Sequence, residues 1–513
     1  MINILLLRGK LLFGGIAMTD GLYLGIDFGV STSYVTKWDD KNRKALPVIG
    51  IDRQLGGNNF FNTVIYYESD TNKVIGNLSS QRSIDDPLNV IEGIKTKLKI
   101  NNWKQMVPSL SRELSAEKVV EDIFRGIKKR VEEIHGGIPV KGVVMAIPSY
   151  FQKDEIAKLK SALENAGFKV LKFVEESVAI IMGCGLWDML SIGTKEKVLL
   201  LDIGADAFEL SIIDLSREAN NNINFEILYT ERTPQLDGNR IEDILVKTFE
   251  DDLGYEIALI AEEKQRRKDQ LQLIEAANEL KENLSYEDES EVFCCGLDKG
   301  KTLSQTVNLQ TFNMLLHRHG FINRMKQIIE NSLVEINCGA EDIDRILLAG
   351  GSANIPLIHS EIKNILGKSP EKMGNPAEFI GKGSGQLCGK ILNGSLLYKI
   401  FFSDKKHSPI VCYDIGIVIG NKFIPFIQPN RDHLMLSDIR YYKIKNNNNA
   451  TLSIYKKDTS NASSPSFVGK IQMGKLSLTD NIIGIQLGVE NCGSVICHLY
   501  EKNCIDPFQS EKL

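Results

Sequence analysis

The chain has 513 residues, of which 43% are hydrophobic and 25% are charged, and its formal net charge is −5. This composition is typical of a globular protein with two or three domains, and it excludes a broad basic surface for nucleic acid or for an anionic membrane. The nine cysteines follow no regular spacing, so we expect reduced thiols and a cytoplasmic location rather than a disulfide framework.

The first 20 residues are predicted to be an untargeted extension. Apolar runs at residues 2–7 and 11–17 flank a short basic segment, which leaves a weak signal peptide as the alternative. Neither run reaches the ~18 apolar residues that a membrane-spanning helix needs, and the rest of the chain has no longer run. The second run continues through Met18, an alternative translation start, into the first predicted strand.

A short motif then occurs twice. Residues 24–29 read Leu-Gly-Ile-Asp-Phe-Gly and residues 200–204 read Leu-Leu-Asp-Ile-Gly, so each copy is an apolar strand that ends in Asp-x-Gly. A second apolar strand follows each copy, at residues 34–38 and 208–214. Two hairpins of one design predict a duplicated fold whose halves face each other.

The segments around the hairpins alternate between strands and helices. A strand, a helix and a strand are expected at residues 143–147, 153–166 and 170–174, which predicts a partly parallel sheet covered by helices. A long helix is expected at residues 256–284. Beyond residue 395 the pattern changes to short strands, at residues 423–427, 451–455, 482–489 and 495–500. We therefore expect a separate all-β domain at the C-terminus.

An aspartate at a strand end, followed by a glycine turn, suits a polyphosphate with Mg²⁺. The backbone N–H groups of the turn can hold phosphate, and the carboxylate can order metal-bound water. A single Asp-x-Gly is more often a structural turn, but two matched copies at Asp27 and Asp202 favour phosphate binding. A third turn, Gly350-Gly351-Ser352, follows another apolar strand, and its amides can approach a ribose closely.

Taken together, these motifs resemble the heat shock protein 70 family over about residues 22–505. Residues 25–29 resemble its first phosphate loop, and residues 146–151 resemble its Val-Pro-Ala-Tyr-Phe segment, in which the proline acts in interdomain switching; Pro148 stands there. The stretch 166–177 is similar to the one that ends in Asn-Glu-Pro, and 350–356 and 375–378 are similar to the adenosine loop and the segment after it.

The resemblance implies a duplicated actin-like α/β ATPase fold at residues 21–395, a linker at 396–412 and a truncated β-sandwich, similar to a substrate-binding domain, at 413–513. It implies ATP or ADP with Mg²⁺, which Asp27 and Asp202 would hold through water, and it makes Asp202 and Glu176 the candidate catalytic residues. The implied nucleotide-binding residues are Asp27, Gly29, Val30, Ser31, Thr32, Gly204, Ala205, Lys281, Ser285, Gly350, Gly351 and Ser352.

The sequence departs from the family where hydrolysis is performed. Val30 and Ser31 replace two threonines, while Asp206 and Ala207 replace a glycine and a threonine in the second loop. Asp206 is expected to repel phosphate, and Ala207 lacks a hydroxyl that would position the attacking water. The family's lysine, four residues after a glycine that matches Gly76, is absent, with Arg82 as the one substitute nearby.

From the sequence we expect no helical lid of the family's kind after the predicted β domain, and the linker sequence differs from that of the family. These features resemble the atypical branch that forms the ribosome-associated complex with a J-domain protein. The expected function is therefore a weakly ATP-binding, poorly hydrolysing chaperone or co-chaperone, with a J-domain partner, the ribosome and nascent chains as expected partners, and without a nucleic-acid motif or a membrane. The alternatives are an active ATP-dependent chaperone, an actin-fold small-molecule kinase and a filament protein.

Overall fold

The computed structural model describes residues 21–52, 59–100, 102–149, 151, 153–218, 223–233 and 236–392. In the C-terminal part it describes nine strands, given below with their bounds. The predicted extension, residues 1–20, and residues 403–412 of the predicted linker lie outside the described residues.

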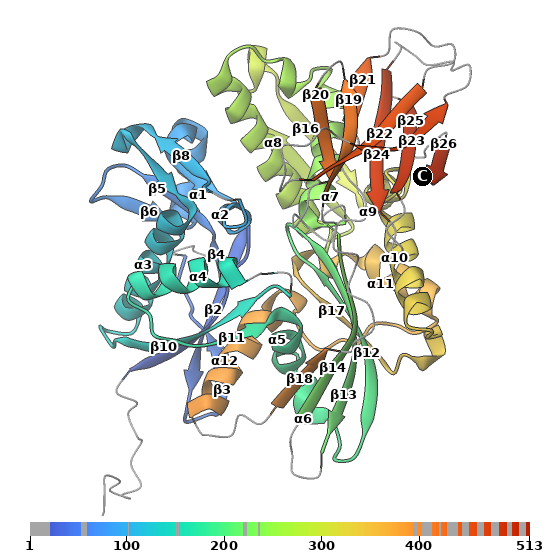
Figure 1. The fold of residues 1–513 in the computed structure, drawn as a ribbon. Coiled ribbons are helices and arrows are strands. Elements are labelled where there is room, and N and C mark those ends of the chain that lie inside the picture. Colours follow the sequence, from blue (N-terminus) through green and yellow to red (C-terminus); the bar gives the residue numbers. More distant parts are fainter. Residues whose placement is uncertain are drawn as a thin grey trace, which may run out of the picture.

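The first lobe is built on a mixed sheet whose strand order is β11-β10-β1-β2-β3 (Figure 1). β1 pairs with β10 in parallel and with β2 in antiparallel orientation, and β4 adds to β2. The strands are β1 (Leu22–Asp27), β2 (Thr32–Asp39), β3 (Lys44–Pro47), β4 (Phe60–Asn62), β10 (Val140–Ile147) and β11 (Val170–Glu175). Helices α3 (Ala116–Ile134) and α4 (Lys153–Asn165) bury apolar side chains in the core of this lobe.

The second lobe repeats this design with strand order β17-β12-β13-β14-β18. β12 pairs with β17 in parallel and with β13 in antiparallel orientation, as β1 does with β10 and β2. The strands are β12 (Lys195–Ile203), β13 (Phe208–Arg217), β14 (Ile223–Thr233), β17 (Arg345–Ala349) and β18 (Tyr398–Phe402). The duplicated fold predicted from the two Asp-x-Gly hairpins is confirmed.

Two helices join the lobes at their base, α5 (Glu176–Gly183) and α12 (Phe379–Leu392). Their side chains form one buried cluster with residues of both sheets. The helices approach each other closely because glycines face backbone: a Cβ on Gly183 would lie 1.8 Å from the carbonyl oxygen of Phe379, and one on Gly383 would lie 1.8 Å from that of Ala179. This contact holds the two sheets at a fixed distance under the cleft.

Smaller elements extend each lobe above its sheet (Figure 1). In the first lobe these are β5 (Val64–Tyr67), β6 (Lys73–Ile75), α1 (Asn77–Asp85), β7 (Val90–Glu92), α2 (Ile94–Lys97), β8 (Lys104–Val107) and β9 (Arg112–Ser115). In the second lobe they are α7 (Gly238–Leu253), α8 (Glu263–Asn283), β15 (Glu289–Cys294) and β16 (Leu303–Asn308). The remaining helices are α6 (Leu186–Met189), α9 (Leu309–Arg318), α10 (Phe321–Glu335) and α11 (Pro356–Leu366).

The long helix predicted at residues 256–284 was placed too early. α8 begins at Glu263, after a short 3-10 turn at Ile257–Leu259. Ile260 is extended, with φ −69° and ψ 119°, and both Ile257 and Ile260 are buried in the lobe core. Burying these two isoleucines outweighs the helical pattern that the sequence continues through them.

The C-terminal strands form two four-stranded sheets, β20-β19-β22-β23 and β21-β24-β25-β26, around a shared apolar core. The strands are β19 (Tyr413–Ile419), β20 (Lys422–Ile427), β21 (Arg440–Lys443), β22 (Thr451–Asp458), β23 (Ser466–Gln472), β24 (Ile482–Val489), β25 (Val495–Glu501) and β26 (Gln509–Lys512). The predicted all-β unit is therefore present.

Part of the predicted linker at 396–412 forms the strand β18, Tyr398–Phe402. β18 pairs in parallel with β14, from Ile223 opposite Tyr398 to Ile227 opposite Phe402, and so completes the second lobe's sheet. The exposed edge of β14 provides unpaired backbone groups, and pairing them stabilises a segment that the sequence pattern assigns to a connection.

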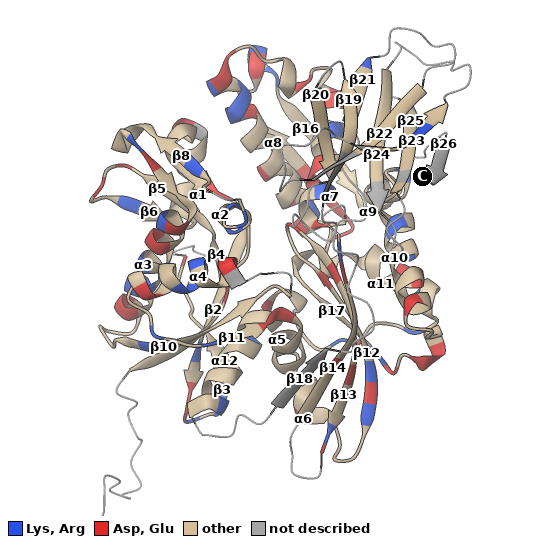
Figure 2. Ribbon diagram, in the orientation of Figure 1, with Lys and Arg blue, Asp and Glu red and all other residues tan. Residues whose placement is uncertain are grey.

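Basic and acidic residues are interspersed on the elements of both lobes (Figure 2). Among the residues that the structure describes, no helix combines the length and the apolar character needed to cross a bilayer.

Candidate nucleotide site

The first hairpin places its aspartate at the base of the cleft. β1 ends at Asp27, which lies opposite Tyr34 of β2, and the turn between the strands carries Val30 and Ser31. Ser31 and Thr32 are exposed, so their hydroxyl groups are available to a ligand.

The second hairpin has the same design in the other lobe. Asp202 lies opposite Glu209, and the turn closes where the backbone N–H of Gly204 donates to the carbonyl of Ala207 at 2.9 Å. The parallel pairing of β12 with β17 sets Asp202 beside Ala349, the last residue before the third turn. Gly350 can then pass close to the aspartate: its φ is +83°, and an added Cβ would lie 2.7 Å from Asp202 Oδ1.

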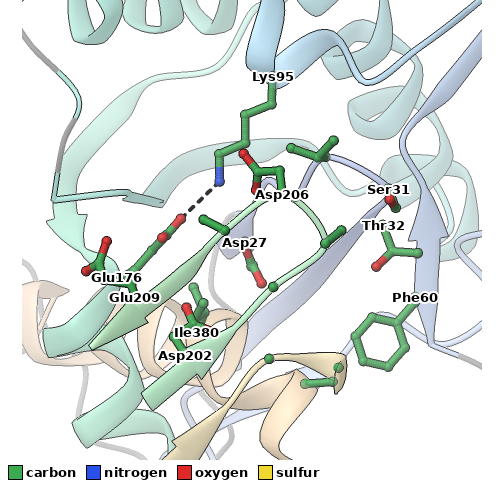
Figure 3. Close-up of a pocket in the computed structure, with 18 residues that line it drawn as sticks. Asp27, Ser31, Thr32, Phe60, Lys95, Glu176, Asp202, Asp206, Glu209 and Ile380 are labelled. Carbon is green, nitrogen blue, oxygen red and sulfur yellow. Dashed lines mark hydrogen bonds and ion pairs between the residues drawn. The ribbon is translucent and has the colours of Figure 1, made fainter. Parts of the chain in front are cut away.

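One pocket lies between these three turns (Figure 3). Of the predicted site residues, it is lined by Asp27, Gly29, Val30, Ser31, Thr32, Glu176, Asp202, Gly204, Ala205, Gly350 and Gly351. It is also lined by Phe60, Lys95, Asp206, Ala207, Glu209, Ala377 and Ile380. Residues far apart in the sequence are therefore brought together around one cavity, from both lobes.

The family's lysine is absent from the position after Gly76, but a lysine from another element reaches this pocket. Lys95, on α2, points into the cavity and its Nζ lies 3.0 Å from Glu176 Oε1 (Figure 3). Ser80, at the position expected for the lysine, accepts a hydrogen bond from Asn62 instead. The suggested substitute, Arg82, is exposed and lies over the ring of Tyr66 at 5.9 Å. The family resemblance predicts a cation four residues after Gly76, on α1, whereas the fold supplies it from α2.

Asp206 is also expected to repel phosphate less strongly than its place in the second turn indicates. Its Oδ2 lies 3.2 Å from Nη2 of Arg232, which is on β14, and the arginine side chain is only 8% exposed. A charge-assisted contact of this kind neutralises much of the carboxylate's field. The side chain of Asp206, in the second turn, is therefore held in place by Arg232 of the adjoining sheet.

Adenosine-side residues lie next to the pocket without lining it. Lys281 Nζ is 2.5 Å from Glu242 Oε1, and a Cβ on Gly238 would lie 3.4 Å from this Nζ and 2.8 Å from Ser352 Oγ. Lys281 and Ser352 thus flank Gly238, at the start of α7. Ser285 lies in the turn after α8, and its hydroxyl donates to the carbonyl of Lys281 at 2.9 Å.

Pro148 is buried just after β10, and the residue after it contacts the pocket. Ser149 Oγ donates to Glu209 Oε2 at 2.9 Å, which links the Pro148 segment of the first lobe to the second hairpin. Sequence reasoning did not identify this contact, because it depends on how the two lobes face each other.

The carboxyl groups of the pocket are strongly perturbed. Burial raises the pKa of Asp27 to about 7, with Lys95 opposing the change and Glu176 adding to it. Burial raises the pKa of Glu209 to about 7 and that of Asp202 well above its usual range, and Glu176 adds to both shifts. Burial alone would lower the pKa of Lys95, but the nearby carboxylates of Glu176, Asp206 and Asp27 hold it above its ordinary value. The pocket therefore favours a cation that would stabilise the ionised carboxylates.

Mg²⁺ bound together with a polyphosphate fits these residues. Asp202 Oδ1 has no hydrogen-bond partner among the described atoms, although the group is enclosed. No three carboxylate, imidazole or thiol side chains in the described ranges are grouped closely enough to hold a metal ion alone. Asp27 and Asp202 would accordingly hold Mg²⁺ through its water ligands, with phosphate oxygens completing the shell.

Two lobes of one duplicated design, with hairpin turns meeting around an acidic pocket, define the actin-like ATPase fold. The model of the family described as Hsp70 protein matches residues 23–408. The chain therefore belongs to the Hsp70 family, rather than to the kinases or filament proteins that share its fold.

Individual relatives agree with this assignment. The Chaperone protein dnaK of Guillardia theta is 25% identical over 410 residues, which cover 74% of this chain and 62% of the relative. The protein of the same name from Gracilaria tenuistipitata var. liui is 26% identical over 409 residues, with 73% and 62% coverage. The chain thus spans less than two thirds of the length of these relatives.

Proposed function

We propose that this chain is an Hsp70-family chaperone or co-chaperone that binds ATP or ADP with Mg²⁺ weakly and hydrolyses ATP slowly or not at all. The observation that carries the proposal is the ion pair between Lys95 and Glu176, at 3.0 Å. Glu176 is the candidate base, and a carboxylate that is bound to an ammonium group is a poor acceptor for the proton of an attacking water.

The second turn supports the same conclusion. Ala205, Asp206 and Ala207 give it no hydroxyl side chain, so the turn lacks the hydroxyl group that would position an attacking water. The carboxylate of Asp206 is paired with Arg232, at 3.2 Å. Compared with the family pattern, the pocket thus retains the residues that bind nucleotide and metal, and it lacks the hydroxyl group that would position the attacking water.

The residues retained have clear roles in binding. The backbone N–H groups of Gly204 and Gly350 donate to the carbonyls of Ala207 and Pro376, so other amides of the three turns would donate to phosphate and ribose oxygens. Asp27 and Asp202, which line the same pocket, would orient the hydrated metal. Mg²⁺ supplies neutralisation of phosphate charge when it is bound. These interactions act equally on the bound nucleotide and on its transition state, so they produce affinity without a large rate enhancement.

Single-turnover hydrolysis tests the proposal. The full chain, at a concentration that saturates labelled ATP in the presence of Mg²⁺, is expected to form little or no ADP, and Asp202→Asn at saturation is expected to leave this low rate unchanged. Rapid turnover that Asp202→Asn abolishes would contradict the proposal and favour an active ATP-dependent chaperone.

We further propose that the chain acts in the cytoplasm with a J-domain co-chaperone, beside ribosomes and nascent chains, as in the ribosome-associated branch of the family. Weak hydrolysis supports this, because a chaperone that cannot drive its own cycle needs a partner to act on clients. Affinity purification of the tagged chain, with and without ribosomes, should recover a J-domain protein in stoichiometric amount. If no J-domain protein were recovered from either preparation, the proposal of a J-domain partner would be contradicted.

A further inference from the structure

Lys95 has an exceptional position in the pocket. Among the lining residues that the structure describes, it alone is cationic, whereas five carboxyl side chains line the same cavity: Asp27, Glu176, Asp202, Asp206 and Glu209. Its side chain is only 8% exposed, so its charge acts on the pocket rather than on bulk solvent.

The ammonium group of Lys95 is held by Glu176, and this contact does not use all of its N–H donors. A lysine carries three N–H donors, and the contact with Glu176 Oε1 at 3.0 Å uses one of them. Asp206, from the turn of the second hairpin, and Asp27, from the end of β1, line the same pocket as Lys95. Lys95 therefore faces both phosphate-binding turns at once (Figure 3).

Different residues lie near the third glycine turn, away from Lys95. Ser352 and Lys281 flank Gly238, next to the third glycine turn, and their chemistry suits a ribose and a base. A nucleotide whose sugar lies there extends its phosphates past the hairpin turns and towards Lys95.

We propose that Lys95 binds the terminal phosphate of a nucleoside triphosphate and so makes the pocket discriminate ATP from ADP. This inference rests on the proposed nucleotide site. Glu176 is then a positioning residue, which holds the ammonium in place while the remaining donors bind phosphate oxygens. The geometry assigns a specificity role to a lysine that lies on a four-residue helix, α2.

Calorimetric titration of the full chain with Mg·ATP and Mg·ADP tests the inference. Lys95→Met should weaken ATP binding by about tenfold or more, and ADP binding by less than about threefold, because only ATP places a phosphate at this lysine. Lys95→Arg keeps the charge and should retain most of the preference. Lys97→Met, on the same short helix, is the matched control and should leave both affinities unchanged.

The outcomes separate the two proposals. Equal losses for ATP and ADP in Lys95→Met, or none, would overturn the role of Lys95 while leaving nucleotide binding intact. If the unmodified chain bound neither nucleotide, the proposed function would fail and this inference with it. Should Lys95→Met not fold, the double variant Lys95→Met/Glu176→Gln removes both charges, and the same ATP-to-ADP ratio decides the question.

Discussion

The pH dependence of stability gives a quantitative test of the pocket's charge environment. Burial moves the pKa of Asp27 from an ordinary value of 3.8 to about 7. Between these values the native state holds a proton that the unfolded chain has released, so the proton stabilises the fold. This stabilisation is complete below the lower value and is lost as the pH rises through about 7.

The expected magnitude follows from the same linkage. For one group with a native pKa of about 7, the free energy of unfolding falls by about 1.4 kcal/mol between pH 6 and pH 8. Glu209, with the same native pKa of about 7, adds a similar decrease. Asp27→Asn is neutral throughout, so its stability should fall by about 1.4 kcal/mol less than that of the unmodified chain.

Urea unfolding at pH 6, 7 and 8, in buffer without Mg²⁺ or nucleotide, measures these slopes. Asp252→Asn is the control, because Asp252 is exposed on α7, and it should keep the slope of the unmodified chain. An Asp27→Asn variant with an undiminished slope would refute the account of Asp27 as a carboxyl group that burial keeps protonated.

Four further substitutions probe the pocket and the helix contact beneath it. Arg232→Met should weaken Mg·ATP binding in calorimetry by exposing the charge of Asp206, and Asp206→Asn in the same chain should restore it; additive effects would show that the two residues act independently. Lys281→Met should weaken ATP and ADP binding to the same extent, and a loss confined to ATP would contradict its assignment to the adenosine side. Gly383→Ala would bring a Cβ to 1.8 Å from the carbonyl of Ala179 and should lower the free energy of unfolding by about 1–3 kcal/mol in urea, whereas unchanged stability would contradict the close helix contact.

The hairpins show what local sequence can predict. Asp27 and Asp202 each follow an apolar strand and precede a glycine turn, so both the strand pairing and the position of the carboxylate are encoded within about ten residues. The duplication then follows from comparing two such segments, without knowledge of their surroundings.

The roles of Lys95 and Arg232 could not be predicted from local sequence. Lys95 lies in a short polar segment with no distinguishing pattern, and its role depends on how α2 packs over the cleft. Arg232 reaches Asp206 because β14 pairs with β13 in a register that places it opposite Glu209. Both contacts belong to tertiary structure, and so do the pairing of β18 with β14 and the late start of α8.

The central claim is that the two hairpins and the third glycine turn form a magnesium-nucleotide site. Calorimetric titration of the full chain with ATP, in the presence and absence of Mg²⁺, tests it most directly. The account predicts one bound ATP per chain, with an affinity that depends on Mg²⁺ and falls in Asp27→Asn and Asp202→Asn. Absence of binding at millimolar ATP, or binding that neither Mg²⁺ nor these substitutions affect, would contradict it.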